Sequence, residues 1–134
     1  MAPVLGSKVN SKRIGPVLDA LTPWLGDGEE VRLVVRANRV NPLVDLLVVT
    51  DRQVLGVGSF DLAERGPKLV VRRSEITSFV VRMTLVDPRR LCVSTRAGEV
   101  SFGNLDRNDV TVVQAALSLV PERAPVAGCG VPAS

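Results

Sequence analysis

The sequence contains no histidine, and aromatic residues make up only 3% of its 134 residues. It has no Gly-x-Ser-x-Gly elbow, no P-loop, no dinucleotide-binding glycine motif and no carboxylate cluster with metal-ligand spacing. These absences remove the groups on which most hydrolases, nucleotide-dependent enzymes and metalloenzymes depend. We therefore predict that the protein is not an enzyme and uses no metal and no cofactor.

Cysteine is also scarce, with Cys92 inside an expected strand and Cys129 in a region rich in glycine and proline. Neither belongs to a CxxC or Cys/His pattern, so no disulfide framework is indicated, and Cys129 is interpreted as incidental. The first residues do not resemble a secretory signal, and no stretch approaches the roughly 18 apolar residues of a membrane span. We expect a reducing, cytoplasmic setting.

The sequence is instead rich in aliphatic residues, because 46% of the residues are hydrophobic and only 3% are aromatic. A chain of this length fits one domain. A core of valine, leucine, isoleucine and alanine favours strands, where β-branched side chains pack well. The net charge of +3 and pI near 9.4 are a mild basic bias, from which no nucleic-acid partner follows.

The N-terminal region divides into two parts. Residues 1–13 are small, polar and basic without periodicity, and we predict a flexible arm. Apolar residues then recur at helical spacing from Val17 to Leu25, and Pro16 suits a first helical position. Pro23 should end this short helix near Leu21, because proline removes a helical hydrogen bond.

The middle of the chain alternates apolar and polar residues, with turn residues every eight to twelve positions, which is typical of a barrel or sandwich. In the first strand we expect Val31, Leu33, Val35 and Ala37 to be buried, and the face with Val34 to be largely exposed to water. In the fifth, Thr77, Phe79, Val81, Met83 and Leu85 should point inward. The seven expected strands are Glu30 to Asn38, Leu43 to Thr50, Gln53 to Ser59, Pro67 to Arg72, Ile76 to Leu85, Arg89 to Thr95 and Glu99 to Phe102.

The period then changes from two to 3.6. Asp106 or Asn104 can cap a helix that runs to about Val120, with Val113 on its apolar face. Pro121 ends it, and residues 121–134 are predicted to be a Pro/Gly-rich tail. The expected domain thus spans residues 14–120.

Seven short strands followed by one amphipathic helix resemble a pleckstrin-homology-like (PH-like) domain. The acidic entry Gly26 to Glu30, the apolar strand Leu43 to Val49 and the turn Thr50-Asp51-Arg52 resemble the bacterial YokE-like branch of that superfamily. The resemblance implies a mainly β (α+β) fold, a split seven-stranded barrel capped by a C-terminal helix, with a short helix before it.

Lipid-binding members of the superfamily grip phosphorylated head groups with basic residues in three loops. The resemblance places Arg36, Arg39, Arg65, Lys68 and Arg96 at the matching positions. Guanidinium groups bind phosphate oxygens through paired donors. The alternative is that these are solvated loop charges, because Asp61 and Glu64 share a loop with Arg65.

Two further features have alternative interpretations. Trp24 is either an exposed anchor for a partner or a core residue that continues the stripe of Val17 and Leu21. The pairs Arg72-Arg73 and Arg89-Arg90 lie at strand ends, where positive charge protects exposed sheet edges from aggregation.

The sequence thus predicts a small interaction module that binds protein, either another copy of itself in a homo-oligomer or a host factor, through a sheet edge and the C-terminal helix. The alternatives are an anionic membrane surface bound through the five basic residues, and a small phage or mobile-element protein that inhibits a host process. We expect no nucleic acid and no small-molecule cofactor among its partners.

Overall fold

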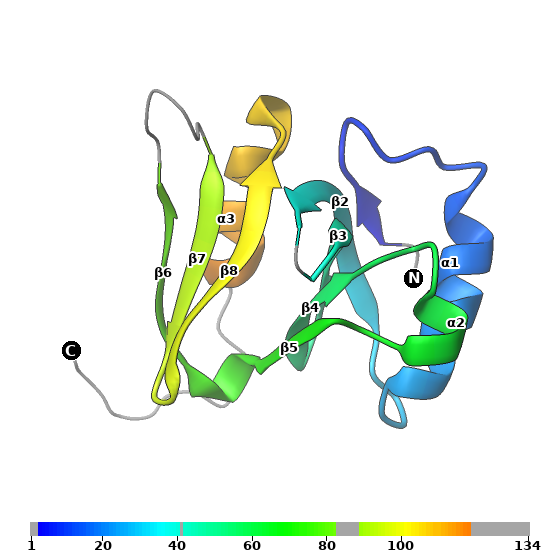
Figure 1. The fold of residues 1–134 in the computed structure, drawn as a ribbon, viewed down its shortest axis with the longest axis horizontal. Coiled ribbons are helices and arrows are strands. Elements are labelled where there is room, and N and C mark those ends of the chain that lie inside the picture. The colour runs from blue at the N-terminus through cyan, green and yellow to red at the C-terminus, as the bar shows by residue number, and fades with distance from the viewer. Residues whose placement is uncertain (1–2, 41, 83–88, 119–134) are drawn as a thin grey trace.

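The computed structural model of the chain describes residues 3–40, 42–82 and 89–118. Two sheets share one strand, with α3 behind β7 and β8 and with α1 and α2 on the other side of the molecule (Figure 1). The strands are β1 (Val4–Leu5), β2 (Val31–Arg39), β3 (Val44–Thr50), β4 (Gln53–Val57), β5 (Leu69–Arg72), β6 (Ile76–Arg82), β7 (Arg90–Thr95) and β8 (Gly98–Leu105). The helices are α1 (Ile14–Leu21), α2 (Leu62–Arg65) and α3 (Val110–Ser118), with single 3-10 turns at η1 (Thr22–Trp24), η2 (Arg73–Glu75) and η3 (Arg107–Asp109).

The strand order is β5-β4-β3-β2-β8-β7-β6, with antiparallel neighbours throughout, and β1 joins β2 from outside this path. β2 pairs with β3 along most of its length and with β8 only at Ala37 and Asn38. It therefore belongs to both sheets and forms the corner between them. The predicted succession of seven strands and a final helix is confirmed.

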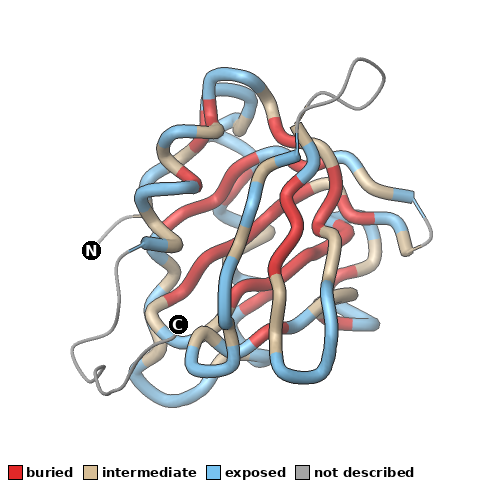
Figure 2. The backbone as a smooth tube through the Cα atoms, turned by 90° about the vertical axis from the view of Figure 1, so that its left-hand side faces the viewer, coloured by how far each residue is buried: buried red, intermediate tan, exposed pale blue. Residues whose placement is uncertain are grey.

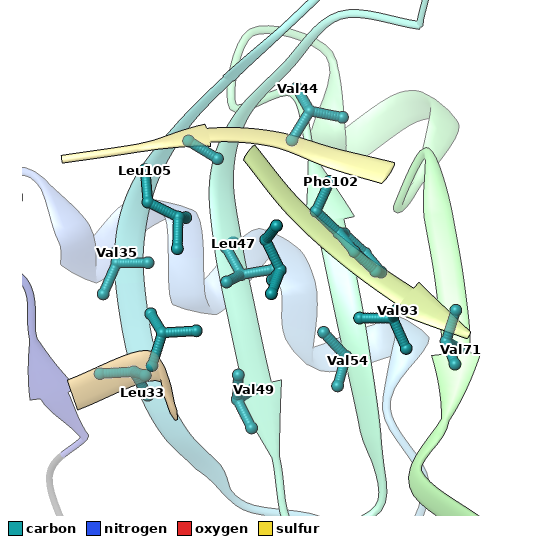
Figure 3. Packing of buried hydrophobic residues seen from close by; sticks show 13 residues of the cluster. Leu33, Val35, Val44, Leu47, Val49, Val54, Val71, Val93, Phe102 and Leu105 are labelled. Atoms are coloured by element: carbon teal, nitrogen blue, oxygen red, sulfur yellow. The ribbon is translucent and has the colours of Figure 1, made fainter. Parts of the chain in front are cut away.

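The main core lies between the sheets and is almost entirely aliphatic (Figure 3). Phe102 is the one aromatic residue among its buried members, and Val113 brings α3 onto it; both side chains are fully buried. The buried segments follow the strands, while the turns are exposed (Figure 2). Burial of this kind contributes about 25 cal/mol per Å² of apolar surface and is the main force that holds the barrel together.

A second apolar cluster covers the outer face of the β2–β5 sheet. It joins Ile14 and Leu21 of α1 and Leu62 of α2 to Val34, Leu46, Val48, Leu55 and Val57. The prediction of a wet face around Val34 is therefore wrong. The continuous apolar runs of β3 and β4 are explained by burial on both faces.

Residues 1–13, for which we predict a flexible arm, contain one short strand, since Val4 and Leu5 pair in parallel with Leu33 and Val34. The Gly6 N–H continues this ladder by donating to the Val34 carbonyl at 2.8 Å. β1 thus occupies the part of the β2 edge that lies before the β8 pairing. A strand of two residues carries too little alternation to be read from sequence.

The remaining differences between the predicted and the observed elements are small, and most concern where an element begins or ends. The loop expected over Phe60 to Gly66 contains α2, and β5 begins at Leu69 instead of Pro67. Thr77 is exposed, not inward, because a register shift between Ile76 and Ser78 moves it out of the alternation. Met83, Leu85 and the predicted tail, with Cys129, lie outside the described residues.

Candidate binding surfaces

The acidic entry loop and the Thr-Asp-Arg turn hold each other in place. The Thr50 hydroxyl donates to Glu29 Oε2 at 2.6 Å and accepts from the backbone N–H groups of Arg52 and Gln53. Glu29 also accepts from Gly26 N–H and from the Gln53 side-chain amide, both at 2.8 Å. Thr50 is fully buried, so this network stabilises one end of the barrel.

A second link joins the same two segments. Asp51 Oδ1 accepts from the Glu30 N–H at 3.0 Å, and the Asp51 N–H donates to the Glu30 carbonyl at 3.1 Å. Glu29, Thr50 and Asp51, which belong to the motifs that carry the resemblance, therefore have hydrogen-bond partners inside the chain. Their role in the structure is architectural.

The first pair of predicted anion-binding residues divides between two roles. Arg39 is half-buried, and its Nη1 donates to the Ser101 carbonyl, which ties the end of β2 to β8. Arg36 is exposed on β2 opposite Leu46. Only Arg36 of this pair presents its charge fully to solvent.

Arg65 and Lys68 both contact Asp61. Lys68 Nζ lies 2.9 Å from Asp61 Oδ2, and Arg65 Nε lies 3.8 Å from the same oxygen. The hydrogen bond from Lys68 lowers the pKa of Asp61 below its usual value. The two cations are thus partly neutralised within their own loop.

Arg96 is exposed in the turn between β7 and β8. Figure 1 shows this hairpin on the opposite side of the molecule from α2, which ends at Arg65. The five predicted residues therefore do not converge on one head-group pocket.

Trp24 lies in η1 with about half of its side chain exposed. A Cβ atom on Gly66 would lie 2.8 Å from the indole ring, so the ring packs directly on the backbone at the end of α2. Gly66 also has φ +73°, a conformation that favours glycine. Trp24 is thus neither a core residue nor a free anchor, since one side packs and the other faces solvent.

Arg73, which the sequence suggests as an edge charge, instead bridges two elements. Its guanidinium donates to the Thr50 carbonyl at 3.1 Å and to the Ala116 carbonyl at 2.9 Å. It therefore joins the β3–β4 turn to the last turn of α3, whose carbonyls have no helical partners. Burial lowers its pKa. Nothing in the sequence distinguishes Arg73 from the exposed Arg72 beside it.

β6 is an edge of the sheet, and within the described residues no strand pairs with its outer side. Ile76, Phe79 and Val81 point from β6 toward the main core but are only partly buried. Ala116 and Leu117 of α3 are partly buried against the same core. An unpaired strand edge thus lies beside incompletely covered apolar side chains.

Three exposed apolar side chains in two loops form a further surface feature, which the sequence did not indicate. Phe60, Val40 and Leu43 are 96%, 74% and 54% exposed in the β4–β5 and β2–β3 connections. In the sequence, the only sign of this surface is the aromatic residue Phe60 in a mostly polar loop.

The described part of the chain contains no group of acidic, cysteine or histidine residues placed to hold a metal ion.

No protein-family model and no curated protein sequence matches this chain. Two solved structures do resemble it. One is a DUF1696 family protein with a pleckstrin-homology domain from Shewanella loihica PV-4, with TM-score 0.57, 19% identity, and coverage of 86% of this chain and 96% of that one. The other is a pleckstrin homology domain from Shewanella amazonensis SB2B, with TM-score 0.53, 22% identity, and coverage of 84% and 90%.

The chain has the pleckstrin-homology fold. The predicted PH-like barrel and the resemblance to bacterial PH-like domains are confirmed at the level of fold. Within the PH fold, β2 to β8 form the barrel and α3 closes it, while β1, α1 and α2 cover its outside. None of the helices in the described ranges is long and apolar enough to cross a bilayer.

Proposed function

We propose that this protein is a non-catalytic module that binds a protein partner by strand addition at β6, beside α3. The observation that carries the proposal is the outer edge of β6, with which no other described strand pairs, next to the partly buried Ile76, Phe79 and Val81. An extended segment can pair with such an edge through main-chain hydrogen bonds, and its side chains can enter apolar sites beneath it.

β6 suits this role better than β5, the other end of the sheet. β6 has seven residues and β5 has four, so β6 offers a longer ladder. Val71 on the inner face of β5 is buried, whereas the inner residues of β6 still have surface to lose. Arg73 fixes the end of α3 near this opening and so pre-forms one wall of the proposed site.

The partner is either a second copy of this chain or another protein, and we expect the encounter in the cytoplasm. Light scattering after size exclusion measures self-association, and affinity capture from the native cell measures association with another protein. In either complex, hydrogen exchange should slow at those amides of β6 that point away from β7, because the added strand would accept their hydrogen bonds.

A matched pair of variants gives the test. Val80 on β6 and Val70 on β5 are both about half exposed. Lysine on an edge strand discourages pairing, so Val80→Lys should lose the association while Val70→Lys keeps it. A wild-type chain that stays monomeric and captures nothing reproducible, or a Val80→Lys variant that associates like wild type, would overturn the proposal.

The second candidate, anionic surface binding through Arg36, Arg39, Arg65, Lys68 and Arg96, draws its support mainly from the exposure of Arg36 and Arg96. Such binding should weaken steeply with added salt in vesicle co-sedimentation. Inhibition of a host process by a phage-derived protein stays a prediction, for which genome neighbourhood is the informative observation.

A further inference from the structure

The N-terminal segment closes over one edge of β2 and is attached there by few contacts. β1 pairs with β2 at two positions, in parallel, and the Gly6 N–H adds one hydrogen bond to the Val34 carbonyl. Parallel pairing is slightly less stable per residue than antiparallel pairing, and Val4 is 56% exposed. We call residues 4–9 the N-terminal strap. Its own strand pairing is therefore weak.

The strap also contacts a carboxylate just before α3. The Ser7 N–H donates to Asp109 Oδ1, but Oδ2 of the same buried carboxylate has no hydrogen-bond partner among the described residues. A Cβ atom on Gly6 would lie 2.7 Å from this Oδ2, so the strap itself covers the unpaired oxygen. A buried acceptor without a donor destabilises the state that buries it. Because release of the strap would expose Oδ2 to water, we expect the strap to open locally while the barrel stays folded.

The helix α3 depends on contacts near both of its ends. Among its described residues, Val113 is the one buried side chain, and a helix this short is marginal without tertiary contacts. The strap holds the start of α3 through Asp109, and Arg73 holds the other end by donating to the Ala116 carbonyl at 2.9 Å. The position of α3 is therefore set from both ends.

The second of these ends borders the edge of β6. Ala116 and Leu117 of α3 pack against the same core as Ile76 and Phe79 of β6. Arg73 begins η2, which leads directly into β6, and the Ile76 N–H donates to the Arg73 carbonyl. In Figure 1, α3 lies between β1 and β6. A change at the start of α3 can therefore reach the apolar opening beside β6 through one continuous set of contacts.

We propose that the N-terminal strap regulates the β6 edge through α3. It rests on the proposed function, because the regulated site is the edge at which a partner strand adds. In one state the strap is docked and α3 is seated; in the other the strap is released and the start of α3 is loosened. The partner binds the first state better, since one wall of its site is then pre-formed. Coupling is reciprocal, so a bound partner should slow hydrogen exchange at Gly6 and Ser7.

A substitution within the strap tests this coupling without altering α3. A side chain at Gly6 would meet Asp109 Oδ2 at 2.7 Å and Val35 Cγ1 at 2.9 Å, so Gly6→Val should force the strap off β2. Ser11→Val is the matched control, because it places the same side chain at an exposed position after the strap. Exchange at Leu47, in the centre of β3, reports whether the barrel stays folded. If it accelerates as well, the smaller Gly6→Ala takes the place of Gly6→Val.

The first readout is hydrogen exchange in the isolated full chain. Gly6→Val should accelerate exchange at the amides of residues 114–118 and of Ile76 by at least about fivefold, and Ser11→Val should not. Equal exchange at these amides in the two variants would overturn the coupling, even if the chain binds a partner at β6.

The second readout is the association measured by light scattering or affinity capture. Gly6→Val should weaken it about fivefold or more, whereas Ser11→Val should leave it unchanged. An association that is equally strong in wild type and Gly6→Val would also overturn the regulation. If wild type associates with nothing while Gly6→Val still accelerates exchange at Ile76, strand addition fails and the link from the strap to β6 is supported.

Discussion

The backbone N–H of Ser7 donates a 2.8 Å hydrogen bond to Oδ1 of Asp109, which joins residues 102 positions apart. The Ser7 hydroxyl also donates to Asp106 Oδ2, at 3.1 Å. Asp106, one of the two predicted caps, accepts from the Asn108 N–H and so caps η3, which leads directly into α3; this hydrogen bond also lowers the pKa of Asp106. The N-terminal segment and the start of α3 therefore stabilise each other.

Removal of the Asp109 carboxylate should release the N-terminal segment. Asp109 is only 2% exposed, and Asp109→Ala removes the acceptor of the Ser7 N–H. We expect unfolding free energy to fall by about 1–3 kcal/mol. Hydrogen exchange should also accelerate at Gly6 and Ser7.

Two variants serve as controls for this experiment. Asp109→Asn keeps an acceptor oxygen and should keep the exchange slow, and Asp19→Ala on the exposed face of α1 should change neither quantity. Unchanged exchange at Gly6 and Ser7 in Asp109→Ala would show that β1 is held by its strand pairing alone.

The Thr50 hydroxyl should contribute more to the free energy of unfolding than its size suggests. Thr50→Val preserves the shape of the side chain but removes the partner of Glu29 and of two backbone N–H groups. The expected loss of unfolding free energy is about 1–3 kcal/mol, measurable by urea denaturation. Thr77→Val, at an exposed hydroxyl that donates to one carbonyl, should cost clearly less. Equal losses would contradict the structural role assigned to the turn.

Arg73 and Arg72 form a natural test pair. Arg73→Met removes the donors to the Thr50 and Ala116 carbonyls, so α3 should loosen and the unfolding free energy should fall by about 1–3 kcal/mol. Arg72→Met, at an exposed neighbour, should have little effect. Thermal unfolding with hydrogen exchange in α3 measures both. Equal changes in stability and exchange for the two variants would contradict the role of Arg73 in joining the β3–β4 turn to α3.

The pairing of Lys68 with Asp61 should be visible in the pH dependence of stability. The folded-state pKa of Asp61 is lowered below 3.8, so the contribution of the pair is present above that pH and is lost as pH falls through the lowered value. Lys68→Gln should therefore be less stable than wild type near neutral pH, with a difference that shrinks in acid. Urea denaturation across pH, with Lys12→Gln as the exposed control, measures this. A difference that grows in acid would contradict the assignment.

Much of the barrel was predictable, because its signals are local. Alternation of apolar and polar residues located the seven barrel strands, and the change to helical spacing located α3. The predicted burial of Leu33, Val35 and Ala37 is confirmed, since the side chains of a regular strand alternate between faces. The prediction for Val31 is wrong, because a register shift between Val31 and Leu33 leaves it half-buried against the second, outer cluster.

The candidate site was predictable only in part. Arg36 and Arg96 are exposed as a binding role requires, but Arg39, Arg65 and Lys68 have partners within the chain. Phe60 was passed over because its exposure depends on a turn built from contacts between two loops. Neither the partners of these basic residues nor the exposure of Phe60 can be predicted from the residues next to them in the sequence.

The sequence by itself therefore determined the order of elements and the inner face of the barrel, through periodicity that acts over a few residues. The tertiary structure decided that helices cover the outer face of the sheet around Val34, and that Arg73 binds the end of α3. It also decided that the Ser7 N–H is held by Asp109. The physical reason is the same in each case. These outcomes depend on partners tens of residues away, whose approach is set by how the two sheets, α1 and α3 pack together.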